Sequence, residues 1–483
     1  MLYAMLLGSI IAVYRAPPFI NQLFFAVVLI CFAVSRRNAI FFAFAFCIVS
    51  RVGNLFTGLL ASGQNVATYH LIGFIDVTFI DLFLAIAIVK ALKRQGAGPF
   101  LFVKPVTWLA AYLLMMFMVS MVVEPLGLGE LARELRRLFT FSLLFSMPRL
   151  LPSASDFRRF AVVLMPMIVV LAAAQLYRFH TGEPLEPMLS GSDYPSEMKL
   201  SIMPSRLTIS MFEAFLFCLY GFALFYWQRS AGVLPRAVFG LLALLAMLVA
   251  VASGTRIWMV SYVVIWIGVA VVAQRSHLER FLMLGGLVVG ALFMVMGDSR
   301  DETVSFIHDR VNSAMVYGQG QAAVADSSID VRLHDKLPKL LGGIGGSPLF
   351  GYGFTSGFYL HEDSDLGALN TVLQSGVLGL LLFINLWWAV LSVLLNRSGL
   401  GASGTRMANR ALQVFCAGAI MVDMSTISIT GFHLPSSRIF FLVTLLCFIA
   451  ENVGCREAAR AKVVPSWGTS VAEDLPATRL RAS

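Results

Sequence analysis

Residues 361–365 read His-Glu-Asp-Ser-Asp and lie directly before a long apolar stretch. They bring three acids and one histidine together in a chain that mostly avoids charge. A carboxylate at the water–membrane boundary can accept a proton from a hydroxyl group, and Asp365 can also cap the helix that follows it. Asp363 and Asp365 form an Asp-x-Asp pair, a spacing that can hold a divalent metal. We take Asp365 as the candidate general base, and Asp363 and His361 as candidate substrate-binding residues.

Three arginines form the second set of candidate residues. Arg206 lies where a loop enters an apolar stretch, Arg256 lies in a short Ser-Gly-Thr-Arg turn, and Arg332 lies in a long polar segment. A guanidinium group is always charged, and its planar fork matches phosphate oxygens. Each arginine taken alone could equally reach a lipid headgroup or a salt bridge. The three together favour a shared anionic ligand.

The segment that follows Arg332 predicts a short amphipathic helix on the membrane surface. Arg332, Lys336 and Lys339 follow the i, i+4, i+7 spacing of one helix face. The stripe opposite them is predicted to consist of Leu333, Leu337, Leu340 and Leu341. Such a helix would turn its basic face toward a lipid diphosphate, or simply toward anionic headgroups. Pro338 is expected to kink it.

Composition determines the class of protein. Of the 483 residues 58% are hydrophobic and only 13% are charged, and apolar runs long enough to cross a bilayer recur from end to end. We expect an all-α, polytopic integral membrane protein with about 12–14 transmembrane helices. The predicted spans are 2–14, 18–34, 39–54, 70–91, 105–123, 132–148, 158–177, 207–227, 234–252, 257–273, 279–296, 366–394, 410–426 and 437–453.

The distribution of charge predicts the orientation. Basic residues, among them Arg36, Arg37, Lys93, Arg94 and Arg149, fall in alternate connections. The positive-inside rule places those connections, and both termini, in the cytoplasm. The net charge of +9 therefore indicates membrane topology, and no nucleic-acid partner is expected. The opposite, outer side receives 124–131 and a long loop at 297–365, and we expect function there.

Two smaller expectations follow from residues inside the apolar runs. Five of the six cysteines lie in such runs and no Cys-x-x-Cys pair is present, so they are predicted to be small buried hydrophobes. Asp81 lies within a predicted span, and structural pairing is its expected role.

Four pieces of this sequence resemble, in order, the bacterial O-antigen ligase and polysaccharide polymerase superfamily of membrane proteins. They are the loop with Arg206, the Ser-Gly-Thr-Arg turn at 253–256, the Ser-Pro-Leu-Phe-Gly-Tyr-Gly-Phe segment at 347–354, and the motif that opens the next span. In the ligases that motif reads His-Asn, nine residues, then Gly-x-x-Gly. Counting back from Gly376 and Gly379 places Asp365 at the ligase histidine and leaves His361 out of register. Arg332 to Gly343 fits an Arg-x10-Gly pattern of the polymerases, so a polymerase is favoured.

The resemblance covers roughly residues 178–394 and implies a domain organisation. We expect N-terminal transmembrane helices at 1–177, a ligase/polymerase-like core at 178–394, C-terminal transmembrane helices at 395–453 and a disordered tail at 454–483. The resemblance implies a fold like that of the GT-C glycosyltransferases in a bacterial inner membrane, with the active site on the periplasmic face.

The same resemblance implies the reaction. Such enzymes transfer a glycan from undecaprenyl diphosphate to a sugar hydroxyl on the next lipid-linked repeat unit, with inversion and without metal or other cofactor. Arg206, Arg256 and Arg332 would clamp the diphosphate and Asp365 would activate the acceptor hydroxyl. The expected partners are the lipid-linked oligosaccharide, membrane lipids and a regulator of chain length.

Three alternatives stay open at the level of sequence. An O-antigen-type ligase would pass the same glycan to lipid A–core or to another acceptor. A metal-dependent, lipid-linked glycosyltransferase would use Asp363 and Asp365 as ligands. A lipid-linked oligosaccharide flippase, or another transporter, would need no catalytic acid, but the chain shows no inverted repeat of the kind that many transporters carry.

Overall fold

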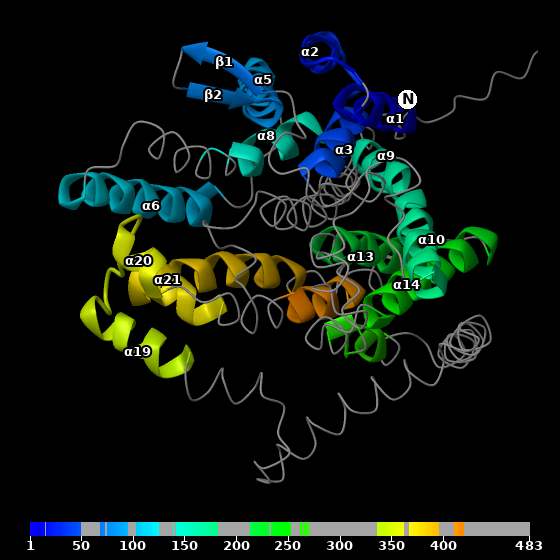
Figure 1. The fold of residues 1–483 in the computed structure, drawn as a ribbon. Helices are drawn as coiled ribbons and strands as arrows, with labels where there is room; N and C mark the ends of the chain where they lie inside the picture. The colour runs from blue at the N-terminus through cyan, green and yellow to red at the C-terminus, as the bar shows by residue number, and fades with distance from the viewer. Residues whose placement is uncertain are drawn as a thin grey trace, which may run out of the picture.

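The computed structural model describes residues 1–14, 16–49, 68–72, 75–94, 103–124, 139, 142–181, 213–230, 233–252, 261–262, 264–269, 336–361, 367–395 and 410–419. These residues are mostly helical, as predicted (Figure 1). The helices are α1 (Leu2–Tyr14), α2 (Pro18–Val34), α3 (Asn38–Val49), α5 (Phe79–Lys93), α6 (Val103–Val123), α8 (Ser142–Leu150), α9 (Ala154–Leu164), α10 (Pro166–Thr181), α13 (Glu213–Arg229), α14 (Val233–Ala252), α19 (Leu337–Gly346), α20 (Ser356–His361) and α21 (Gly367–Leu395). Residues 261–262, 264–269 and 410–419 are helical as well.

Four stretches among the described residues are long and apolar enough to cross a membrane. They are Lys104–Val123, Ser155–Ala174, Val233–Ala250 and Leu369–Ala389. The apolar helices at Leu2–Ala12, Phe19–Val34 and Asn38–Val49 are shorter. A helical membrane protein is therefore supported, whereas the full number of spans stays a prediction. The predicted span at 279–296 and the one at 437–453 lie outside the described residues.

Among the described residues, one predicted span does not begin as a helix. The first part of the predicted span 70–91 forms an antiparallel hairpin of β1 (Thr68–Ile72) and β2 (Ile75–Thr78), with His70 opposite Asp76. The helix begins only at Phe79, because Thr78 and Asp81 form a capping box: the Thr78 N–H donates to the Asp81 carboxylate (N···O 2.8 Å). Asp81 thus has a structural role, as predicted.

A second predicted span contains a break. Residues 158–177 fall in two helices, α9 and α10, which meet at Met165. Pro166 has no N–H to continue the first helix, and its fixed φ suits the first position of a new one. The pattern of helical hydrogen bonds is therefore interrupted at Pro166.

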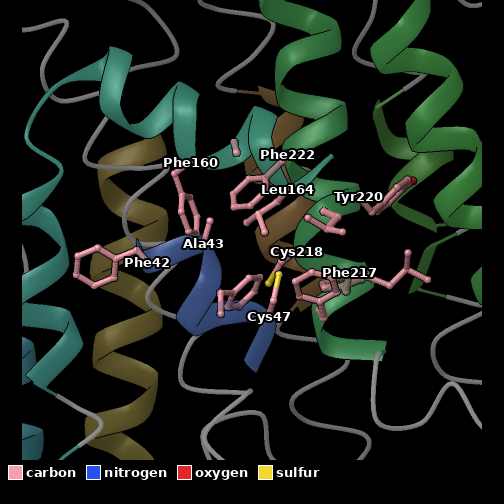
Figure 2. Close-up of a cluster of buried hydrophobic side chains, with 14 of the residues drawn as sticks. Phe42, Ala43, Cys47, Phe160, Leu164, Phe217, Cys218, Tyr220 and Phe222 are labelled. Carbon is pink, nitrogen blue, oxygen red and sulfur yellow. The ribbon is translucent and has the colours of Figure 1, made fainter. Parts of the chain in front are cut away.

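Helices α3, α9 and α13 enclose a densely packed part of the apolar core (Figure 2). The rings of Phe46 and Phe215 lie 4.9 Å apart, and those of Phe160 and Phe222 lie 5.9 Å apart edge to face. The prediction for the cysteines is confirmed for those in this core and in 410–419, namely Cys47, Cys218 and Cys416. Cys31 departs from it, because it lies exposed on α2.

Lys90 joins the ends of two earlier helices. Its ammonium group donates to the carbonyl oxygen of Ser35 (N···O 2.8 Å) and to Asn38 Oδ1 (2.8 Å). It donates also to the carbonyl of Phe32, and it lies 4.3 Å from the centre of the Phe32 ring. One cation therefore satisfies carbonyl groups left over where α2 ends and orients the first residue of α3.

Arg94, the residue that follows α5, makes a similar connection. Arg94 Nη1 donates to the carbonyls of Arg149 (3.3 Å) and Leu150 (3.2 Å), where α8 ends. Asn38 Nδ2 also donates to the Leu150 carbonyl (3.1 Å). The ends of α2, α5 and α8 and the start of α3 therefore meet at one place. The charge pattern of the sequence predicts that the connections at these helix ends lie on one side of the membrane.

We predict that Lys90→Met lowers the free energy of unfolding by about 2–3 kcal/mol, because three oxygen acceptors lose a charged donor. The measurement is the thermal unfolding midpoint of the purified protein in detergent. Lys93→Met is the matched control, since Lys93 is exposed and one turn further along α5, and it is expected to change stability by less than about 0.5 kcal/mol. Equal effects of the two substitutions would contradict a structural role for Lys90.

Candidate functional site

Helix α21 is interrupted at Gly376, where the backbone has φ 65° and ψ −177°. Such an interruption divides the helix into Gly367–Ser375 and Val377–Leu395. At any helix end, the last carbonyls and the first N–H groups lack partners within the helix. These groups cannot be left bare in an apolar interior, because each unpaired group costs free energy comparable to a lost hydrogen bond.

The segment 348–353 satisfies the carbonyls of the first half. The N–H of Tyr352 donates to the carbonyl of Leu373 (N···O 2.8 Å). The N–H of Gly353 donates to the carbonyl of Gln374 (2.7 Å). Two carbonyls at the end of the first half-helix therefore have partners from a loop about 20 residues earlier in the chain.

The same segment accepts hydrogen bonds from the second half. The N–H of Val377 donates to the carbonyl of Pro348 (2.9 Å), and the N–H of Leu378 donates to that of Leu349 (3.3 Å). Donors and acceptors are thus exchanged in both directions. We refer to these four hydrogen bonds, between 348–353 and 373–378, as the backbone joint.

Two glycines make the close approach at the backbone joint feasible. Gly376 and Gly351 both have positive φ, 65° and 69°, a region that side chains other than glycine enter at a cost. A Cβ on Gly376 would collide with the carbonyl group of Leu349, and one on Gly351 with the carbonyl group of Gln374. At each glycine, the backbone of the opposite segment therefore occupies the space that a side chain would need.

Helix α6 supports the backbone joint from the side, and Figure 1 shows it alongside α21. The Tyr112 hydroxyl donates to the carbonyl of Ser375 (2.6 Å), the residue directly before the break. Ser120 Oγ accepts from the N–H of Phe354 (2.9 Å), just after the loop segment. Both parts of the joint are therefore fixed to the same helix.

The residue that follows α6 holds α20 in place. Glu124 Oε2 accepts from the backbone N–H of Ser356 (2.8 Å) and from its hydroxyl (3.0 Å). Ser356 is the first residue of α20, where a carboxylate suits the unpaired N–H groups. Glu124 begins a segment that was predicted for the outer side, as was the loop that contains Ser356.

His361 lies at the end of α20 in a defined position. Its ring stacks on that of Tyr352 with centres 5.9 Å apart and planes 10° apart, and it lies over Gly343 of α19. Its Nδ1 donates to the carbonyl of Gly357 (2.9 Å), since a carbonyl can only accept. In the neutral ring Nε2 is then an acceptor, which could receive a hydrogen bond from a hydroxyl. His361 is exposed, so such a ligand could reach it.

The two predicted lysines lie at the start of α19. Lys336 is the half-buried residue preceding the helix and Lys339 is exposed in its first turn. Lys339 and Gly343 are four residues apart and so share a face of α19, which places Lys339 one turn from the position where His361 packs. The structure therefore brings Lys339 and His361 to neighbouring parts of one surface.

One detail of the predicted amphipathic helix is wrong. Pro338 does not kink it, because the helix begins at Leu337 and proline fits the first turn. In the predicted apolar stripe, Leu340 is fully buried against Phe358 and Leu373, whereas 49% of Leu341 is exposed.

The other predicted site residues lie outside the described part of the chain. They are Arg206, Arg256, Arg332, Asp363 and Asp365. Their proposed roles stay predictions. The structure describes only the helix ends that flank Asp363 and Asp365. These are His361, the last residue of α20, and Gly367, the first residue of α21.

Sequence reasoning missed a buried polar stripe on the first half of α21. Asn370, Thr371, Gln374 and Ser375 are all buried, and Gln374 Nε2 has no hydrogen-bond partner in the described part of the structure. The spacing i, i+1, i+4, i+5 puts these side chains on one face of a helix. That spacing was visible in Asn-Thr-Val-Leu-Gln-Ser, but the residues were counted as part of an apolar span.

Comparison with known proteins gives no assignment. No protein-family model and no curated protein matches this chain. Its function must be argued from its own residues.

We predict that Gly376→Ala destabilises the protein by at least about 2 kcal/mol, because alanine meets both the positive φ and the Leu349 carbonyl. The matched control is Gly342→Ala in α19, where an added Cβ meets nothing within 4 Å. That control should be neutral or stabilising by up to about 1 kcal/mol, since alanine favours helix more than glycine does. Thermal unfolding of both variants in detergent is the measurement. A Gly376→Ala protein as stable as wild type would show that the joint does not constrain this position.

Proposed function

We propose that this chain is a polysaccharide repeat-unit polymerase of the bacterial inner membrane. It transfers a growing glycan from undecaprenyl diphosphate to a hydroxyl group on the next lipid-linked repeat unit. The transfer inverts the anomeric centre and needs no metal. An O-antigen-type ligase, which would pass the glycan to another acceptor, is the second candidate.

The observation that supports this proposal is the backbone joint. Two of the four pieces that carry the family resemblance, the segment 347–354 and the Gly-x-x-Gly at 376–379, contact each other through it. Both motifs therefore contribute to the same backbone contact. Helices α20 and α21, which flank Asp365 in the sequence, are both tied into this unit, α20 through Glu124 and α21 through the joint. Such a frame is what a catalytic acid between them requires.

The proposed chemistry uses residues on this frame and in the long loop. Asp365 accepts the proton of the acceptor hydroxyl as the oxygen attacks the anomeric carbon. The bond from that carbon to the diphosphate oxygen breaks, and the diphosphate leaves with its electron pair. Arg206, Arg256 and Arg332 stabilise the negative charge on it. Lys339 and His361 are exposed, so a polar substrate could contact them.

The nature of the break in α21 supports an enzyme over a transporter. Transporters use broken helices because the free half-helix ends bind ions or substrate near the middle of the membrane. In α21 the carbonyls of Leu373 and Gln374 and the N–H of Val377 already have backbone partners. These groups are therefore engaged in holding the loop and not available to a cargo.

The decisive test is product size. The purified protein in nanodiscs is given a lipid-diphosphate-linked oligosaccharide from its native host, with and without a chelator. We expect a chelator-resistant ladder of products, and we expect Asp365→Asn to lower its rate by about 100-fold or more. Asp156→Asn is the matched control, because Asp156 bonds to Ser153, the N-cap residue of α9, and is not part of this frame, so it should keep the activity.

Other outcomes identify the alternatives. A single transfer that requires an added acceptor would indicate a ligase. Sensitivity to the chelator would indicate metal ligation by Asp363 and Asp365. Movement of the lipid-linked glycan across the bilayer without any transfer would indicate a flippase and overturn the proposal.

A second prediction concerns the diphosphate. Arg332→Lys is expected to lower the polymerisation rate by about 100-fold, because a point charge cannot replace the planar fork on two phosphate oxygens. Arg410→Lys, an equivalent change at an exposed helical position, should leave the rate unchanged. Wild-type activity in Arg332→Lys would remove Arg332 from the diphosphate site.

A further inference from the structure

The meeting place of α2, α3, α5 and α8 carries a concentration of exposed positive charge. Lys90 and Arg94 hold these helix ends together through backbone carbonyls. Around them lie five exposed basic residues, which we name the basic cluster: Arg36, Arg37, Lys93, Arg158 and Arg159.

The last two members belong to the same end of the bundle. Helix α9 begins only four residues after Leu150, whose carbonyl accepts from Asn38, and α9 packs against α3. Arg158 and Arg159 fall in the second turn of α9, about 6–8 Å from its start at a rise of about 1.5 Å per residue. They therefore extend the positive surface that begins at Arg36 and Arg37.

Little negative charge balances this surface. Asp156 is the one acid in the described residues 16–49, 82–94 and 142–164. Its carboxylate is engaged at the start of α9, where Ser153 Oγ donates to Asp156 Oδ2 (2.6 Å). The basic cluster therefore has a strong net positive charge, and its members sit on helix ends that hydrogen bonds fix in place.

Apolar side chains are exposed directly beside the charges. Val34 on α2, Leu92 on α5 and Val162 on α9 are 81%, 62% and 38% exposed. A ligand that covers both kinds of surface must have an anionic group next to a hydrocarbon part. A phospholipid has this structure, whereas inorganic phosphate does not.

We infer that the basic cluster is a binding site for the headgroups of anionic phospholipids, in the leaflet that faces this end of the bundle. Arginine and lysine side chains at the surface attract such headgroups, and clustered basic residues between helices hold them. The acyl chains of the bound lipid would cover Val34, Leu92 and Val162. The site shares no residue with the proposed glycosyl-transfer site, and it does not depend on that function.

The test measures lipid selectivity with the purified full-length protein in detergent. A fluorescent phosphatidylglycerol is bound, and unlabelled phosphatidylglycerol, phosphatidylcholine or inorganic phosphate is added as competitor. We expect phosphatidylglycerol to compete at least about tenfold better than phosphatidylcholine, and the difference should shrink at high salt. Equal competition by the two lipids would overturn the proposal, as would competition by inorganic phosphate at the same concentration as the lipid.

Matched variants locate the site. The pairs Arg36→Gln/Arg37→Gln and Arg158→Gln/Arg159→Gln should each lower the selectivity several-fold, and all four changes together should abolish it. Lys104→Gln/Arg410→Gln removes the same charge as either pair but from exposed positions on other helices, so it should keep the selectivity.

A charge-conserving variant distinguishes a loss of lipid binding from a loss of folding. The four arginines changed to lysine should retain most of the selectivity, since the attraction to headgroups is mainly electrostatic. Retained selectivity in a folded variant with all four arginines changed to glutamine would overturn the proposal. The lysine variant and the wild-type competition decide the question even where the glutamine variant does not fold.

Discussion

The requirement that buried backbone groups be hydrogen-bonded governs the described part of this protein. Most of the described residues meet it by forming helices. Where a helix is interrupted, at Gly376, the partners come from another segment, and the interruption becomes the contact that fixes residues 348–353. The positions of α6 and α20 follow, because Tyr112, Ser120 and Glu124 all bond to this unit. One local break therefore organises a region that spans about 270 residues of sequence.

The same requirement explains why a lysine and an arginine lie at the helix ends of this fold. Lys90 and Arg94 donate to carbonyls at the ends of α2 and α8, which no helix could satisfy. Their long apolar stems lie along the helices while their charged ends reach the last turn of a neighbour. The helix ends beside the exposed arginines are held together as a result.

Hydropathy predicted most of the helices well, since α1, α2 and α14 begin and end within a residue or so of the expected limits. It failed at 70–78, where apolar β-branched residues form a hairpin and only the Thr78–Asp81 pair marks the start of a helix. It also gave no sign of the break at Gly376, because glycine occurs in many transmembrane helices and only the approach of residues 348–353 shows its purpose. A long-range contact of this kind is not encoded in local composition.

The candidate site was predicted in parts. The sequence drew attention to 347–354, to the glycines at 376 and 379, and to His361, but not to their contacts with one another. Tyr112, Ser120 and Glu124 were overlooked, because single polar residues at the end of an apolar helix carry no distinctive pattern. Gln374 was overlooked for a related reason. A helix with a few polar residues at one end still has an apolar mean hydropathy over 20 residues.

The contact of Lys90 with the corner between α2 and α3 also has a consequence for the order in which the protein assembles during synthesis. The carbonyl of Ser35 and the ammonium of Lys90 are 55 residues apart in sequence. The corner between α2 and α3 is therefore synthesised, and delivered to the membrane, well before its donor exists. Until α5 has left the ribosome that corner must keep its carbonyls in contact with water or headgroups. The corner between α2 and α3 therefore gains its charged donor only after α5 has been synthesised.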